Sequence, residues 1–409
     1  MRMSTSIISV LRLPVSASRK AKRTLLSAGL FLASCLFPLL LTSCHSDDSD
    51  DPSEQRNCTN TVFIFMPWTG SQSSSYGSLT KVIQQNIHDI QTETKNGNSD
   101  KATRTIVLFA DTTVHSTLFE VKGDGTTRKI EEYPHGYITT TAALRTLLNK
   151  VAAYSSTATY SMLIGSHGNG WLPAGSQPAE SRAFGGTSAA TQMEVDTLAD
   201  AITSSKIGKM QYVCFDDCYM ASIETAYSLR NATHWLVAST SEVMDIGLPY
   251  STVWRYLSST NVDYSKVIDA FGAFYTNYDY PYGALAAIDC SKTDKMAELM
   301  KALNKKYEGW DYDLSTIQAL DGFRSHVYYD MGAYINTLCG NDTTGNQQVY
   351  NELKSLVPYK FTTPSLYTVY QGGYSYKVRT FSGISTSDPT ENASAMNIKK
   401  KTKWWKATH

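Results

Sequence analysis

The sequence predicts an α/β fold, in which a mostly parallel sheet is flanked by helices and followed by a C-terminal accessory α+β region. Short apolar runs alternate along the chain with longer segments of helical spacing, which is the pattern of a parallel sheet built from β-α-β units. The runs are almost continuously apolar, as expected for strands buried on both faces. Two runs end in residues that could serve as a base and a nucleophile, and parallel sheets carry their sites at such strand ends.

Five apolar runs are the predicted parallel strands. They lie at residues 61–68, 105–110, 161–165, 210–215 and 235–238. Apolar residues spaced three and four apart predict helices at residues 79–94, 139–153, 192–203 and 221–230. The alternation at residues 116–133 predicts a hairpin. These elements together predict a core domain over residues 59–250.

The chain changes in character after residue 250, so we take residues 251–409 as an accessory region packed on the core. A strand at 284–288 separates helices predicted at 267–277 and 293–307. The chain ends in the basic and aromatic run KKKTKWWKATH. This run could face a membrane or a polyanion, but a solvated end of a helix or strand is the more common structure, and we expect it here.

The first 43 residues have the pattern of a secretory signal peptide. They contain six basic residues and no acidic one, and a long apolar run follows the last basic residue. The run ends in Leu-Thr-Ser-Cys at residues 41–44, which resembles the lipobox of bacterial lipoproteins. A transmembrane anchor is the competing interpretation, because the run approaches the roughly 20 residues that a span needs. We expect residues 1–43 to be removed and Cys44 to carry the lipid, with palmitate among its acyl chains.

Residues 44–58 are predicted to form an acidic disordered tether. Cys44 is followed by HSDDSDDPSE, which has no apolar residue to bury and resembles the surface-export signal of Bacteroidetes lipoproteins. We therefore expect a lipid-anchored protein of the bacterial cell envelope, at the outer membrane, with exposure at the cell surface left open. Without residues 1–43 the chain has 31 basic and 37 acidic residues, a net charge of −6. The lack of a basic excess argues against a nucleic-acid partner.

The residues that carry chemistry follow the third and fourth predicted strands. The third strand leads into Ser166-His167-Gly168, and the fourth leads into Asp216-Asp217-Cys218. Adjacent strands lie about 5 Å apart, so we expect His167 and Cys218 to approach each other. A nearby imidazole and the N-terminus of a helix beginning near Ala221 would both favour the reactive thiolate of Cys218.

These motifs resemble those of a known family. A His-Gly after one strand and an Asp-x-Cys after the next are similar to caspase-like cysteine peptidases, and FDDCYM at 215–220 with SIETAYSLR at 222–230 resembles the clostripain family. The resemblance covers about residues 59–250 and includes VFIFMPW at 62–68. It implies a caspase-like fold and a cysteine endopeptidase that cleaves polypeptides after Arg or Lys.

The resemblance also implies roles for the reacting groups. Cys218 would be the nucleophile and His167 the general base and acid. The backbone N–H groups of Gly168 and Cys218 would form the oxyanion hole. Self-cleavage at a basic residue between His167 and Cys218 is known in the family, and the candidates here are Arg182, Lys206 and Lys209.

The resemblance further implies acidic residues that bind the basic P1 side chain. Asp216 matches one such residue, and the second is either Asp245 or Glu242. Asp217 stands where the family usually has a small residue. Its carboxylate would either oppose thiolate formation at Cys218 or strengthen the preference for basic substrates.

Two further hypotheses compete with the peptidase hypothesis. Cys214 and Cys218 could hold a metal with Asp216 and His167, but their spacing fits zinc sites poorly, so we expect no metal site. The dyad needs no cofactor, and calcium is implied only by the family. The competing function is an inactive peptidase-like surface lipoprotein that binds peptides or glycans. Among the remaining histidines, His115 and His326 have no evident partner in the sequence.

Overall fold

The computed structural model describes residues 58–174, 183–340, 342, 344–370 and 375–409. The predicted signal peptide, Cys44 and nearly all of the predicted tether lie outside these residues, as does Arg182. In the part that is described, none of the helices combines the length and apolar character needed to cross a membrane.

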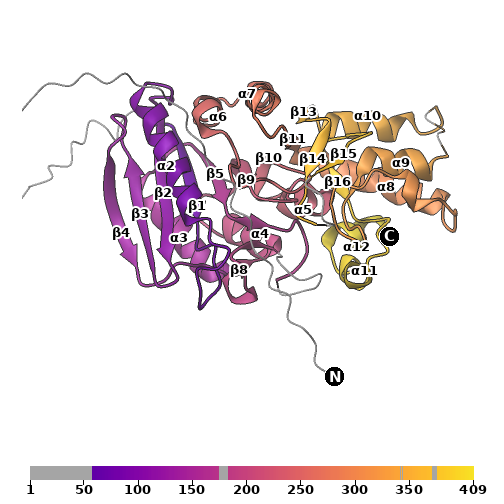
Figure 1. The fold of residues 1–409 in the computed structure, drawn as a ribbon, viewed down its shortest axis with the longest axis horizontal. Helices are drawn as coiled ribbons and strands as arrows, with labels where there is room; N and C mark the ends of the chain where they lie inside the picture. Colours follow the sequence, from indigo (N-terminus) through magenta and orange to yellow (C-terminus); the bar gives the residue numbers. More distant parts are fainter. Residues whose placement is uncertain (1–57, 175–182, 341, 343, 371–374) are drawn as a thin grey trace, which may run out of the picture. The chain divides into compact units, whose positions relative to one another are not determined.

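The described chain is built around one nine-stranded sheet. Its five inner strands are parallel: β10 (Thr233–Ala238), β9 (Met210–Asp216), β5 (Thr159–Gly165), β1 (Asn60–Met66) and β2 (Thr103–Thr112). Antiparallel strands extend both edges: β3 (His115–Val121) and β4 (Thr127–Tyr133) beside β2, and β11 (Ala284–Asp289) and β13 (Tyr359–Thr362) beside β10. Figure 1 shows the sheet running across the view from β4 to β13. The predicted mostly parallel sheet, its five strands and the hairpin are confirmed.

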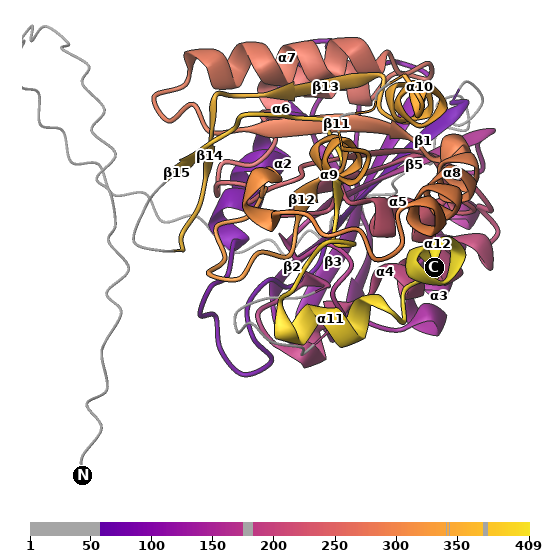
Figure 2. The same ribbon diagram turned by 90° about the vertical axis from the view of Figure 1, so that its right-hand side faces the viewer.

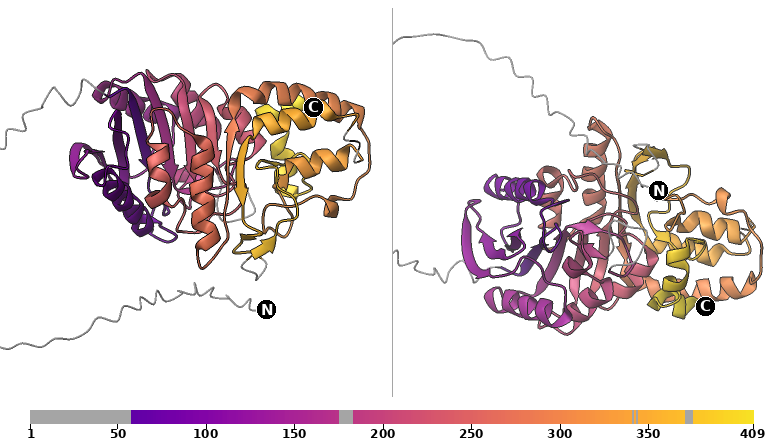
Figure 3. Two further views of the ribbon diagram at one scale, coloured as in Figure 1. Left: turned by 90° about the horizontal axis from the view of Figure 1, so that it is seen from above. Right: turned by 60° about the horizontal axis from the view of Figure 1, so that its bottom comes forward.

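Helices cover both faces of this sheet. One face carries α2 (Thr80–Lys95), α6 (Tyr250–Leu257) and α7 (Tyr264–Asn277), and the other carries α3 (Thr141–Tyr154), α4 (Val195–Thr203), α5 (Ile223–Leu229) and α8 (Thr293–Lys306). The side chains of β1 explain the two layers, because alternate strand residues point to opposite faces. Ile64 packs with the α2 and α6 side chains, whereas Phe63 and Phe65 pack with those of α3. Figures 2 and 3 show helices on both sides of the strands.

The remaining elements are short, and most belong to the accessory region. The helices are α9 (Met331–Leu338), α10 (Gln347–Leu356), α11 (Ala393–Lys399) and α12 (Lys403–Thr408). The strands pair as β6 (His167–Gly168) with β7 (Phe184–Gly185), β7 with β8 (Gln192–Met193), β12 (Tyr329–Asp330) with β16 (Ser385–Thr386), and β14 (Ser365–Tyr367) with β15 (Ser375–Lys377).

The C-terminal run does not form a solvated end, so that expectation is wrong. Trp404 in α12 is 1% exposed, and its ring centroid lies 5.7 Å from that of Tyr227 in α5. The basic side chains around it are mostly exposed. An amphipathic helix explains both facts, since its aromatic side packs on the core while its lysines remain in water.

Candidate active site

The carboxyl ends of β5 and β9 place the two predicted reacting residues at one edge of the sheet. The last residues that pair between these strands are Gly165 and Asp216. His167 and Cys218 each lie two residues beyond that pair. Both line a cavity of about 280 Å³.

Cys218 lies in the turn after β9 and is half-buried. Its Sγ accepts a hydrogen bond from the N–H of Val243 at 3.2 Å. Burial raises the pKa of the thiol to about 12; the Val243 N–H opposes this shift, and nearby carboxylates, first that of Glu242, add to it. The resting group is therefore a thiol that needs a base.

The connection from Cys218 to the next helix differs from the prediction. The helix α5 begins at Ile223, with Ser222 as its N-cap, rather than near Ala221. Cys218 thus lies outside the first turn of α5, which weakens the helix-dipole argument. Tyr219, directly after Cys218, has a φ of 62°, a left-handed conformation that is uncommon for a residue with a side chain and often found at functional sites.

His167 is held by a backbone carbonyl from a distant loop. Its Nε2 lies 2.7 Å from the carbonyl O of Gly77. A carbonyl can only accept, so Nε2 carries the proton and Nδ1 of the neutral ring is an acceptor. Burial lowers the pKa of His167, and the bond to Gly77 opposes that shift. His167 is therefore a neutral imidazole whose Nδ1 can accept a proton.

Gly77 is a site residue that the sequence analysis missed. It has a φ of +72°, and a Cβ there would lie 2.8 Å from Cγ2 of Thr187. Only glycine fits both the backbone conformation and the space. The sequence offered only a glycine in a serine-rich loop, with no sign of a partner 90 residues away.

Gly168 lies in close backbone contact with Cys218. A Cβ at position 168 would lie 2.5 Å from the O and 2.9 Å from the N of Cys218. Only a glycine allows this approach. The contact brings the two residues predicted to form an oxyanion hole side by side.

Asp216 is the first of the three predicted P1-binding carboxylates, and the surroundings of the three differ. Asp216 is buried, and its oxygens accept from the N–H of Leu248 at 2.7 Å and the hydroxyl of Tyr250 at 3.0 Å. Burial raises the pKa of Asp216 to about 6, although both hydrogen bonds oppose the shift. Asp216 lines the cavity together with Glu242 and Asp245.

Glu242 and Asp245, between which the sequence could not choose, differ in their contacts. Glu242 is buried and accepts from the hydroxyl of Tyr219 at 2.8 Å, the hydroxyl of Thr368 at 2.7 Å and the N–H of Val369 at 2.8 Å. Asp245 is exposed, and within the described residues it makes no hydrogen bond or ion pair. The carboxylate of Asp245 is thus the more available of the two.

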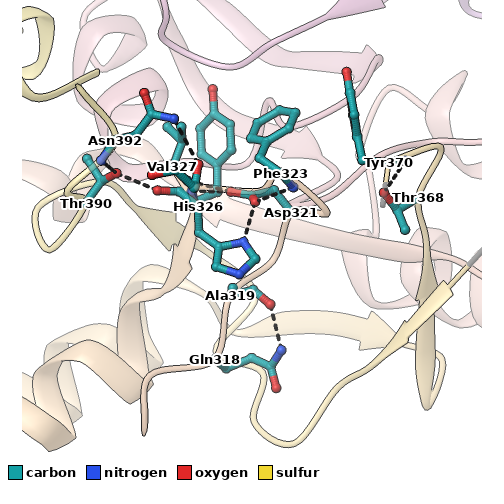
Figure 4. A network of polar contacts seen from close by, with 12 residues as sticks. Gln318, Ala319, Asp321, Phe323, His326, Val327, Thr368, Tyr370, Thr390 and Asn392 are labelled. Atoms are coloured by element: carbon teal, nitrogen blue, oxygen red, sulfur yellow. Dashed lines mark hydrogen bonds and ion pairs between the residues drawn. The ribbon is translucent and has the colours of Figure 1, made fainter. Parts of the chain in front are cut away.

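The accessory region forms part of the cavity wall, which the sequence analysis also missed. Tyr367, Val369 and Tyr370 line the cavity, and Glu242 holds this segment. The ring of Tyr370 packs edge-on against Phe323, with centroids 4.9 Å apart. Figure 4 shows Phe323 next to Asp321, and Tyr370 next to Thr368.

Asp321 organises the turn behind that wall. Its carboxylate accepts from the backbone N–H groups of Phe323, Val327 and Tyr328 and lies 2.7 Å from Nδ1 of His326. His326 therefore has a partner, and so does His115, whose Nδ1 lies 2.7 Å from Asp111. The interpretation that these histidines lack partners was wrong.

Cys214, Lys206 and Lys209 are the remaining residues that the sequence singled out. Cys214 is fully buried within β9. Across the described ranges, no three His, Cys, Asp or Glu side chains form a group that could hold a metal ion. Lys206 and Lys209, two of the candidate self-cleavage residues, are exposed.

The chain is similar to known proteins in sequence and in fold. A family model described as the clostripain family matches residues 75–397. A secreted C11 cysteine protease from Bacteroides thetaiotaomicron, "iotapain", is 36% identical, with a TM-score of 0.78 over 86% of this chain and 99% of that chain. No curated protein matches.

Two further solved structures are similar. A clostripain from Bacteroides thetaiotaomicron in complex with the peptide inhibitor BTN-VLTK-AOMK is 40% identical, with a TM-score of 0.52 over 55% of this chain and 99% of that chain. An inactive zymogen C11 protease from Parabacteroides distasonis shares the fold, with a TM-score of 0.70 at 21% identity over 86% of this chain and 99% of that chain.

Proposed function

The chain belongs to the clostripain family of cysteine peptidases, and from that premise we propose that it is an endopeptidase that cleaves polypeptides after Arg or Lys through Cys218 and His167. One observation carries the proposal. The carbonyl of Gly77 fixes the proton on Nε2 of His167 and leaves Nδ1 as the acceptor of a ring that lines the same cavity as Cys218. A neutral base and a half-buried thiol that line one cavity are suited to nucleophilic catalysis by a cysteine.

The proposed reaction begins with transfer of the Cys218 proton to Nδ1 of His167. The thiolate attacks the scissile carbonyl carbon, and the N–H groups of Gly168 and Cys218 stabilise the oxyanion that forms. The imidazolium then gives its proton to the departing amine, leaving an acyl-enzyme. Water, deprotonated by His167, hydrolyses the acyl-enzyme, and Cys218 regains its proton.

The raised pKa of Cys218 is compatible with this order of events. Burial and nearby carboxylates keep the thiol protonated in the free protein. A cationic P1 side chain would offset the negative charge of those carboxylates when a substrate binds. Proton transfer would then be favoured mainly in the substrate complex.

The preference for a basic P1 residue is proposed to depend mainly on Asp245. It lines the cavity and has a carboxylate that no described residue engages. Asp216, which lines the same cavity, would contribute a second, buried carboxylate. The similar clostripain from Bacteroides thetaiotaomicron was solved with an inhibitor whose peptide ends in lysine, which supports the same preference here.

Fluorogenic peptides with different P1 residues test the proposed activity. The purified protein should cleave after Arg and Lys and not after Asp. Cys218→Ala should have no activity, and His167→Ala should lose about 10²–10⁴-fold in kcat because the general base is gone. If wild type and Cys218→Ala are equally inactive on every peptide and no basic chloromethyl ketone labels Cys218, the proposal fails and the competing peptide-binding function gains support.

The role of Asp245 can be separated from that of Glu242 with a neutral substrate of nearly the same shape. Peptides carrying Arg or citrulline at P1 differ mainly in charge. Asp245→Asn should lower kcat/KM for the Arg peptide by about 10- to 100-fold, the usual value of a charged hydrogen bond, with little change for citrulline. Glu242→Gln should affect both peptides alike, because Glu242 holds the wall segment. If Glu242→Gln alone removes the Arg preference, the assignment must be reversed.

We also propose that Cys44 anchors the protein to the bacterial envelope. The lipobox-like sequence supports this, and the similar iotapain is described as secreted. Labelling of expressing cells with radioactive palmitate should mark wild type and Cys35→Ser but not Cys44→Ser. Unchanged labelling of Cys44→Ser would show that Cys44 is not the acylated residue.

A further inference from the structure

Asp217 lines the cavity, and its carboxylate is held by hydrogen bonds to Ser166. The side chain is 1% exposed. Its Oδ1 accepts from the N–H of Ser166 at 2.7 Å, and its Oδ2 accepts from the hydroxyl of Ser166 at 2.9 Å. Both oxygens are thus bound to a single residue on the neighbouring strand end.

The position of this contact in the two strands is informative. Backbone pairing between β5 and β9 ends at Gly165 and Asp216. Ser166 and Asp217 are the next residues along the two chains. Their contact therefore links β5 and β9 one residue beyond the last backbone pair, through the side chain of Asp217. His167 and Cys218 are the residues that follow immediately.

The backbone beyond the contact is equally close. A Cβ on Gly168 would lie 2.6 Å from the Cβ of Asp217 as well as against the backbone of Cys218. Neither chain has room to move toward the other. The Ser166–Asp217 hydrogen bonds oppose separation of the two strand ends, and their burial keeps water from competing for them.

We propose that Ser166 and Asp217 form a clasp that sets the distance between His167 and Cys218, so that Asp217 is a positioning residue for proton transfer. This inference rests on the function proposed above. It assigns to Asp217 neither charge stabilisation nor substrate binding. Displacement of reacting groups by about 1 Å can cost about 10²-fold in rate. Loss of a clasp next to both His167 and Cys218 can therefore lower the rate by a similar factor.

Two substitutions of Asp217 separate geometry from charge. Asp217→Asn removes the charge but can keep both contacts, since the amide oxygen accepts from the Ser166 N–H and the amide nitrogen donates to the Ser166 hydroxyl, which can act as acceptor. The Ser166 hydroxyl also lies 3.1 Å from the carbonyl O of His167 and can donate there. Asp217→Ala removes both contacts. Ser166→Ala removes one and keeps the backbone contact.

The measurement is kcat per active site, with sites counted by an irreversible lysine chloromethyl ketone on the purified full protein. Asp217→Ala should lose about 10²-fold, Ser166→Ala should lose less, and Asp217→Asn should recover most of the wild-type value. KM should change little in all three. A purely structural role of Asp217 would lower the number of folded molecules. Because kcat is expressed per counted active site, molecules that fail to fold do not contribute to it.

A double substitution provides the second readout. If the two residues act as one clasp, Ser166→Ala combined with Asp217→Ala should cost little more than Asp217→Ala alone. If Asp217→Ala keeps the wild-type kcat per site, the clasp is overturned. It is also overturned if Asp217→Asn is as slow as Asp217→Ala, because the charge of Asp217 would then be what catalysis needs. A wild type that neither cleaves nor binds the ketone would instead remove the proposed function, and the clasp with it.

Discussion

At the scale of single residues, the carbonyl of Gly77 decides how His167 can act. Histidine has two ring nitrogens, and its catalytic use depends on which one carries the proton. The contact of 2.7 Å with Nε2 leaves Nδ1 as the acceptor. The backbone of Gly77 is held there by a left-handed conformation that glycine adopts without strain.

Substitution of Gly77 by alanine should therefore impair catalysis. Gly77→Ala introduces backbone strain of about 1–2 kcal/mol and a methyl group 2.8 Å from Cγ2 of Thr187, so the carbonyl must shift. We expect kcat to fall by about 10-fold or more, measured on a Lys peptide.

Gly97 provides the matched control. Its φ is +77°, and a Cβ there meets nothing within 4 Å. Gly97→Ala should lose similar stability in urea unfolding and keep its kcat. Equal loss of kcat in the two variants would contradict the role of the Gly77 carbonyl.

At the scale of elements, the C-terminal helix α12 packs on α5, the helix that follows Cys218. Trp404 packs on Tyr227 of α5, and its Nε1 donates to the carboxylate of Asp388 at 3.2 Å. The buried Nζ of Lys399 donates to the carbonyl oxygens of Ser387, Asp388 and Thr390. The last residues of the chain are thus joined to the core near α5.

Removal of the buried tryptophan should show this contribution. Trp404→Ala should lower the free energy of unfolding by about 3–5 kcal/mol, because it leaves a large cavity. Trp405→Ala should cost less than about 1 kcal/mol, since that ring is only partly buried and stacks on terminal His409. Urea unfolding of both variants tests the difference, and similar losses would show that α12 is not anchored through Trp404.

At the scale of the whole molecule, several carboxyl groups are buried and have raised pKa values. Burial, with a contribution from Asp388, raises the pKa of Glu224 to about 8, and burial raises that of Asp216 to about 6. In the unfolded chain both groups would lose their protons near pH 4. The folded protein therefore binds more protons than the unfolded chain at intermediate pH.

This difference predicts a stability that falls as pH rises. A group whose pKa is raised by folding stabilises the protein below its unfolded pKa, and that contribution is lost as pH rises through the folded pKa. From about pH 4, where the unfolded groups lose their protons, up to about pH 8, the free energy of unfolding should decrease, as measured by urea unfolding at a series of pH values. Glu224→Gln should flatten the slope, and an unchanged slope would exclude Glu224 as its source.

The core could be predicted largely correctly from the sequence because its signals are local. Continuous apolar runs predicted β1, β2, β5, β9 and β10, since strands buried on both faces need no polar alternation. The same runs showed where His167 and Cys218 leave the sheet. The start of α5 was predicted two residues too early, because capping by Ser222 depends on a single side chain.

The parallel sheet, the resemblance to the family and the positions of His167 and Cys218 after their strands can be read from the sequence, because each depends on residues close together in the chain. The tautomer of His167, the different surroundings of Asp245 and Glu242, the contacts of Asp217 and the burial of Trp404 become visible only in the folded protein. Each of these depends on contacts between segments separated by tens to hundreds of residues, such as Gly77 with His167 and Thr368 with Glu242. A sequence shows which side chains are apolar. It does not show which group a polar side chain will bond to, because that partner is brought close only when distant segments pack together.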